Sequence, residues 1–87
     1  MSVFSLLQQI AEYWEQSAAG GSLHIVLEDQ NVGDKSVQWC LEHAKEVGDV
    51  MGVKIAQALL DIPESWRVFV LVVWDMSRTW GEWTPER

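Results

Sequence analysis

The sequence predicts a mostly α-helical fold, a compact bundle of about four short helices with a short extended segment at residues 22–30. Three observations support this fold class. Apolar residues recur at helical spacing along most of the chain, and glycines and capping residues divide the pattern into short pieces. The 87 residues suffice for one hydrophobic core, so residues 1–87 are expected to form a single domain.

The first helix is predicted near the N-terminus. Its apolar residues lie three and four positions apart and are Val3, Leu6, Leu7, Ile10 and Trp14. Polar residues occupy the opposite side, and Gly20-Gly21 is expected to end the helix. In the next segment, Leu23, Ile25 and Leu27 alternate with other residues, which permits a short strand. A lone strand must pair with another, so an extended linker or a single turn is an equal interpretation.

Two helices are predicted in the middle of the chain. Asp34 is a candidate N-cap for a helix that runs to residue 47 and ends at Gly48. Asp49 can cap the next helix, and residues 61–64 (Asp-Ile-Pro-Glu) resemble a capping box for the last one. Such short connections favour antiparallel helix hairpins.

The last predicted helix, residues 66–78, is apolar on nearly every side. One stripe contains Trp66, Phe69, Val70, Val73 and Trp74, and the other side carries Val68, Leu71 and Val72. A helix of this kind is either buried all round or shared with another chain, which predicts a homo-oligomer. Because the run is rich in β-branched residues, an α+β fold with strands at residues 23–28 and 67–74 is the alternative. Residues 79–87 contain Gly81 and Pro85 and are expected to form an irregular tail.

Charge and cysteine content restrict the classes of partner. The chain has 13 acidic and 6 basic residues, a net charge of -7, and no cluster of Lys and Arg, so direct DNA or RNA binding is not expected. The single cysteine, Cys40, forms no intrachain disulfide and is typical of a reducing compartment. The longest apolar run, residues 68–74, is far shorter than the ~20 residues of a membrane span, and no signal peptide is recognisable. A cytoplasmic protein without a membrane partner is expected.

The sequence contains no convincing catalytic or metal site. Cys40 and His43 are three residues apart on one predicted helix, a spacing open to a nucleophile–base pair or two metal ligands. Cys40 lies within an apolar stripe, however, and His24 is the only other histidine. Residues 28–34 resemble a calcium loop but place Asp34 where glycine is required. We therefore expect no enzyme activity, no metal and no cofactor.

Six tryptophans in 87 residues are the main functional signal. Trp14, Trp66 and Trp74 belong to apolar stripes and are expected in the core. The remaining three are Trp39, on a polar helix side, and Trp80 and Trp83, in the tail. Exposed tryptophans are frequent hot spots of protein interfaces. The predicted binding residues are Trp39, Trp80, Trp83, Arg78, Arg67 and Leu71.

Three interpretations of these tryptophans remain open at this point: a surface for another protein, a surface covered by a second copy, and packing within the chain. A further binding mode is the stacking of a small nucleotide on tryptophan, with Arg67, Arg78 or Lys35 holding its phosphates.

Two stretches of the chain resemble small phage-encoded proteins. They are residues 20–31 (Gly-Gly-Ser-Leu-His-Ile-Val-Leu-Glu-Asp, then Asn31) and residues 39–45 (Trp-Cys-Leu-Glu-His-Ala-Lys). Gly48-Asp49, Gly52 and Leu59-Leu60 extend this resemblance, which covers roughly residues 20–64 and brings no established activity. It implies a counter-defence inhibitor that docks on a bacterial host defence protein. The alternatives are an oligomeric sponge for a cyclic nucleotide immune signal and a small structural or regulatory phage dimer.

Overall fold

The computed structural model describes residues 3–17 and 21–80 of the chain, with side chains for residues 3–16 and 21–77. Its five helices are α1 (Val3–Ser17), α2 (His24–Leu27), α3 (Asp34–Val47), α4 (Val50–Leu60) and α5 (Glu64–Trp80). The mostly α-helical prediction is confirmed. The described residues contain no strand, so the α+β alternative, with strands at residues 23–28 and 67–74, is wrong.

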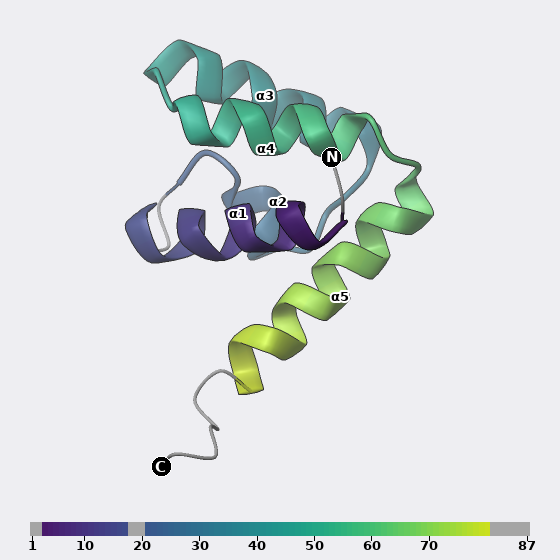
Figure 1. The fold of residues 1–87 in the computed structure, drawn as a ribbon. Helices are drawn as coiled ribbons and strands as arrows, with labels where there is room; N and C mark the ends of the chain where they lie inside the picture. Colours follow the sequence, from purple (N-terminus) through teal and green to yellow (C-terminus); the bar gives the residue numbers. More distant parts are fainter. Residues whose placement is uncertain (1–2, 18–20, 81–87) are drawn as a thin grey trace.

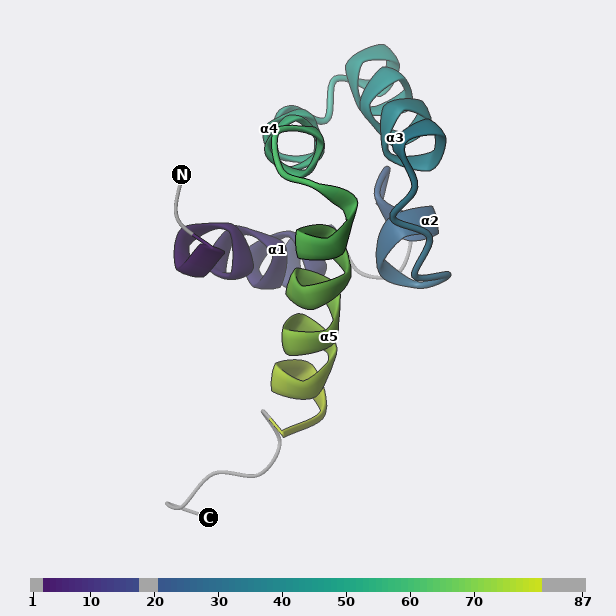
Figure 2. The same cartoon turned by 90° about the vertical axis from the view of Figure 1, so that its right-hand side faces the viewer.

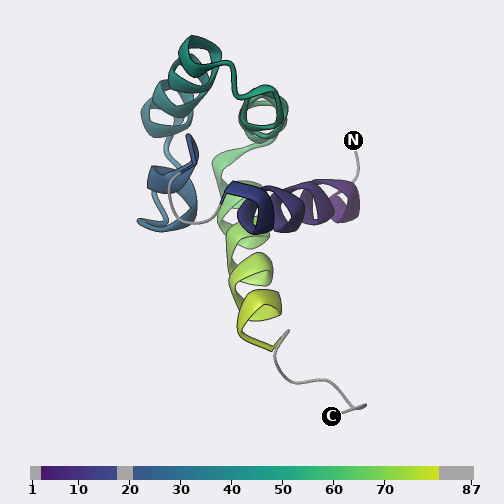
Figure 3. The ribbon, with the colours of Figure 1, turned by 90° about the vertical axis from the view of Figure 1, so that its left-hand side faces the viewer.

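Helices α1 to α4 pack together as the body of the domain, and α5 projects away from them (Figure 1). Helices α3 and α4 lie side by side as an antiparallel hairpin, and α1 crosses below α4. Helix α2 lies next to α3, as Figure 2 shows. Helix α5 leaves the end of α4, passes α1, and extends away from the other helices in all three ribbon views (Figure 3). One side of α5 therefore faces the body and the other faces solvent.

The turn between α3 and α4 follows the predicted capping chemistry. Gly48 adopts a left-handed conformation with φ of 74°, which ends α3 at the expected position. The Asp49 carboxylate accepts a hydrogen bond from the Gly52 N–H at 3.0 Å, so the predicted cap of α4 is confirmed. Asp34, by contrast, is the first residue of α3 and makes no cap, because Gly33 holds that position. The Asp34 carboxylate pairs with Arg67 instead.

Residues 22–30 contain one helical turn, α2, so the single-turn interpretation is confirmed and the extended segment is wrong. A strand points alternate residues to opposite sides, whereas this segment buries the consecutive residues Val26 and Leu27 together with Leu23. A helical turn places these three side chains on one side. The Leu23 N–H also donates a hydrogen bond to the Tyr13 hydroxyl at 3.2 Å, which attaches the turn to α1.

The core contains a polar contact between α1 and α4. The Tyr13 hydroxyl donates to the Asp49 carboxylate at 2.8 Å, and burial, helped by this bond, raises the pKa of Tyr13. Burial alone would raise the pKa of Asp49, but hydrogen bonds from Gly52, Tyr13 and Ser22 outweigh it and hold that pKa below its ordinary value. A Cβ at position 21 would collide with the Tyr13 ring and hydroxyl, so the chain needs glycine there.

Helix α5 is rotated from the orientation that its sequence pattern predicts. Its buried side chains are Arg67, Val70, Leu71 and Trp74. Trp74 meets Trp14 of α1 edge to face, with ring centroids 5.3 Å apart. Trp66, which we expected in the core, is 48% exposed. Among the described residues, no helix is both long and apolar enough to cross a membrane.

Candidate functional site

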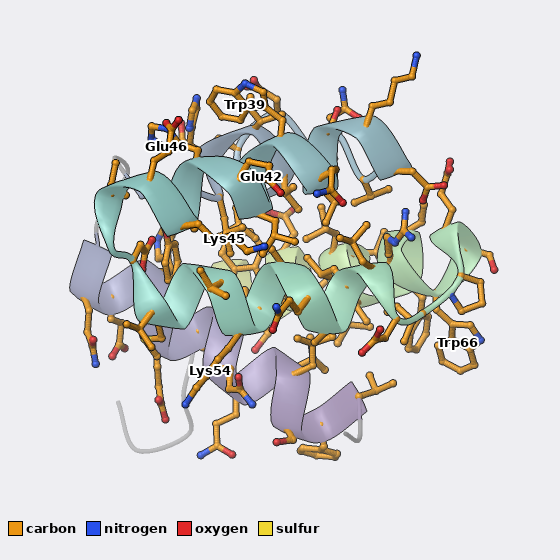
Figure 4. The ribbon with its side chains drawn as sticks, turned by 90° about the horizontal axis from the view of Figure 1, so that it is seen from above. Trp39, Glu42, Lys45, Glu46, Lys54 and Trp66 are labelled. Carbon is orange, nitrogen blue, oxygen red and sulfur yellow. The ribbon has the colours of Figure 1, made fainter. Side chains whose placement is uncertain are left out.

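Trp39 is a half-exposed aromatic side chain on the solvent side of α3, as the polar surroundings of this position predicted. Figure 4 shows it projecting outward from α3. Its ring stacks on His43, one helical turn along, with centroids 5.1 Å apart and planes 8° from parallel. His24 of α2 meets the same ring edge to face at 6.3 Å. These two contacts stabilise the orientation of the indole that the structure shows.

A shallow groove of about 720 Å³ lies beside this ring, along α3 and toward the junction of α4 and α5. We call it the Trp39 groove. Its lining residues are Asp34, Lys35, Gln38, Trp39, Glu42, Leu60 and Arg67. The groove combines one flat aromatic surface and one leucine with several polar groups.

Two carboxylates stand at the groove. Glu42 accepts a hydrogen bond from Gln38 at 2.9 Å and lies 3.9 Å from the Lys45 ammonium group. The side chain of Asp34 is 80% exposed although one oxygen accepts from Arg67. Because both carboxylates remain largely in solvent, each can receive a further hydrogen bond from a cationic ligand.

Arg67 lies at the bottom of the groove and has a structural role. Its side chain is only 5% exposed, and it donates to the Leu59 carbonyl at 2.6 Å and to the Val32 carbonyl at 2.9 Å. A third bond, of 2.6 Å, reaches the Asp34 carboxylate. The guanidinium thus joins the start of α3, the end of α4 and α5. The Nε and Nη1 donors of Arg67 serve these three acceptors, which gives the residue a structural role, and its binding of a ligand phosphate stays a prediction.

A second exposed surface, which we call the α5 outer face, consists of Trp66, Val68, Phe69, Val72 and Met76. Each of these side chains is about half exposed. Trp66 and Phe69 contact each other edge to face at 5.5 Å, and Trp66 is visible at the start of α5 in Figure 4. Sequence analysis placed Trp66 in the core and so missed the aromatic end of this face.

The other predicted binding residues are distributed differently. Leu71 is 4% exposed and belongs to the core, so its assignment to a binding surface is wrong. Trp80 is the last residue of α5, which corrects the prediction that the irregular tail begins at residue 79. The side chains of Arg78 and Trp80 lie outside the described part of the chain, as does Trp83 entirely.

Cys40 and His43 have separate environments despite their spacing. Cys40 is fully buried in the core, and burial raises the pKa of its thiol although two backbone groups, of Val26 and Ile25, lower it. His43 instead stacks on Trp39 at the surface. Within residues 3–17 and 21–80, no three His, Cys, Asp or Glu side chains are arranged to hold a metal ion.

Comparison with other proteins gives no independent indication of function. No protein-family model, curated protein or solved structure matches this chain. The resemblance of residues 20–64 to small phage proteins therefore stays a prediction. Inferences about function rest on the Trp39 groove and the α5 outer face.

Proposed function

We propose that this protein is a non-enzymatic binding domain that docks on another protein through the Trp39 groove. The observation that carries the proposal is the half-exposed Trp39 indole, which stacks on His43 and contacts His24. An aromatic side chain that is already oriented loses little conformational entropy on binding. Tryptophans in such positions commonly dominate interface energetics, and their truncation costs about 2 kcal/mol or more.

The groove offers two exposed carboxylates to a cationic segment of the partner, and its lining also contains two cations, Lys35 and the buried Arg67. A guanidinium or ammonium group can lie over the face of Trp39 while Glu42 or Asp34 accepts its hydrogen bonds. The net charge of -7 increases the encounter rate with a basic surface. The partner chemistry we propose is therefore an exposed arginine or lysine flanked by apolar residues.

The resemblance to phage-encoded proteins suggests a bacterial defence protein as the natural partner, which makes the domain a counter-defence inhibitor. Basic nucleic-acid-binding surfaces of such proteins have the required charge. Sequestration of a cyclic nucleotide is the alternative, with Lys35 beside Trp39 in the groove; Arg67 is already bonded to Leu59, Val32 and Asp34, and two exposed carboxylates would oppose a phosphate.

The proposal can be tested with defined peptides and ¹⁵N NMR. The probe is a short peptide with a central arginine between two leucines, and the matched peptide carries glutamate instead. We expect the arginine peptide to shift the Trp39 indole N–H signal, assigned with a Trp39→Phe variant, and the glutamate peptide to leave it unchanged.

A matched pair of variants locates the binding. Trp39→Ala should weaken binding of the arginine peptide at least tenfold. Trp66→Ala removes an equally exposed tryptophan outside the groove and should leave binding unchanged. Equal losses in the two variants, or equal binding of both peptides, would contradict a cation-selective Trp39 groove.

A further inference from the structure

We infer that the α5 outer face is the interface with a second copy of this chain, and that the two α5 helices pack against each other in antiparallel orientation. The α5 outer face is separate from the Trp39 groove, so dimerisation and partner binding can be tested independently. The dimer is supported by the spacing of the apolar residues, the charge of the face, the direction of α5 and the exposed area.

The spacing of the face matches that of a helix–helix seam. Three residues of the face, Trp66, Phe69 and Met76, form a seam together with the neighbouring Val73, and Val68 and Val72 flank it. The seam residues are separated by three, four and three positions, the alternation found where two helices interlock side chains. Val73 is partly exposed, and the other three are about half exposed. One helix of 17 residues can therefore offer a continuous apolar stripe to another of the same kind.

Charge favours a second copy as the occupant of this face. None of its five residues is charged, whereas the chain as a whole carries -7. A strongly basic partner would find no carboxylate within the face to pair with. An identical face is equally apolar, so two acidic chains can meet here without placing like charges in the contact.

The direction of α5 favours antiparallel pairing. The helix runs outward from the other four (Figures 1 and 2). Parallel pairing would bring two acidic bodies together at the Trp66 end of the helices. Antiparallel pairing places the bodies at opposite ends and sets the two helix dipoles in their favourable arrangement. In the matching register, Trp66 of each copy meets Met76 of the other, and Phe69 meets Val73.

The exposed area suits a reversible dimer. Five side chains that are about half exposed present roughly 500 Å² of apolar surface, near the upper range for patches on monomeric proteins. Pairing two such faces removes roughly 1,000 Å² from water, the lower limit for a specific interface. Interfaces of this size are typical of weak, transient association, so we expect a reversible dimer that forms in the micromolar concentration range.

Sedimentation velocity from about 1 to 300 µM protein should show conversion of monomer to dimer over this range. Phe69→Glu places a charge at the centre of the face and should keep the protein monomeric at every concentration, with an unchanged helical circular dichroism spectrum. Phe4→Glu is the matched control, since Phe4 is 84% exposed on α1, and it should dimerise like wild type. A monomeric wild type, or a Phe69→Glu variant that still dimerises, would overturn the inference. Loss of dimer in Trp39→Ala but not in Phe69→Glu would move the interface to the Trp39 groove.

Cysteine cross-linking determines the orientation. An equimolar mixture of Trp66→Cys and Met76→Cys chains, distinguished by mass, should yield mainly the mixed disulfide on oxidation. The native Cys40 is buried and its pKa is raised, so it should not compete. Disulfides that form only between identical variants would show parallel pairing and overturn the antiparallel arrangement.

Discussion

Replacing Arg67 with methionine should destabilise the fold severely. Methionine approximates the volume of the arginine stem but leaves the Val32 and Leu59 carbonyls without the bonds they now accept at 2.9 and 2.6 Å. A buried carbonyl that loses its donor costs about 1–3 kcal/mol. The Leu59 carbonyl keeps a weaker bond from the Ile62 N–H at 3.4 Å, so its cost lies at the lower end.

The ion pair with Asp34 should contribute much less than the two carbonyl bonds. Its carboxylate is 80% exposed, and an exposed pair contributes at most about 1 kcal/mol. Arg67→Met is therefore expected to lower the free energy of unfolding by about 3 kcal/mol in total. A domain of 87 residues has a free energy of unfolding of about 4–13 kcal/mol, so this loss is a large share of its stability.

Urea unfolding followed by far-ultraviolet circular dichroism measures this loss, and the thermal midpoint should fall by roughly 12–24 °C. Asp34→Asn is the control and should cost less than about 1 kcal/mol, since it removes only the exposed pair. An Arg67→Met variant within 1 kcal/mol of wild type would refute the reasoning about the carbonyls. An Asp34→Asn variant as unstable as Arg67→Met would show that the ion pair, and not the carbonyl bonds, carries the stability.

The remaining predictions concern the turn between α3 and α4. The pKa of Asp49 is lower in the folded state than in the unfolded state. Its ionised carboxylate therefore stabilises the fold at pH values above the unfolded-state pKa, and this stabilisation is lost as the pH falls through the folded-state pKa. The free energy of unfolding should therefore decline below about pH 4, and less steeply in Asp49→Asn; identical slopes would argue against this role. Gly48→Ala should cost about 1 kcal/mol in urea unfolding because φ is 74°. Gly33→Ala, at a φ of -63°, adds no such strain and should cost only the weaker preference of alanine for the N-cap of α3, a few tenths of a kcal/mol after the unfolded chain's loss of freedom is counted. Equal costs at the two glycines would remove backbone strain as the explanation.

Features set by neighbouring residues were predictable from the sequence. The periodic apolar residues of α1, α3 and α4, and the Asp49 cap between the last two, depend on interactions within a few positions. The exposure of Trp39 was predictable for the same reason, because its neighbours along the helix surface are polar. The Trp39 groove was not, since it also requires Leu60 and Arg67, which only the tertiary fold brings to α3.

The α2 turn shows where local patterns mislead. Three alternating apolar residues, Leu23, Ile25 and Leu27, indicated an extended segment. The structure uses Leu23, Val26 and Leu27 as the buried set, because a helical turn lets them pack together against the core. Tyr13, ten residues upstream of Leu23, supplies the hydroxyl that anchors the turn. Such a partner lies too far along the chain for the local pattern to reveal.

Helix α5 was misjudged because of its one central cation. Sequence patterns place charged side chains in solvent, so the pattern does not indicate that the side of α5 that carries Arg67 is buried. Three acceptors from α3, the loop before it and the end of α4 draw Arg67 inward together with Val70, Leu71 and Trp74. Rotation of the helix toward this side leaves the opposite, uncharged side outside. The bonds that bury Arg67 are therefore also the reason that Trp66 and Phe69 face solvent, where we infer that a second chain covers them.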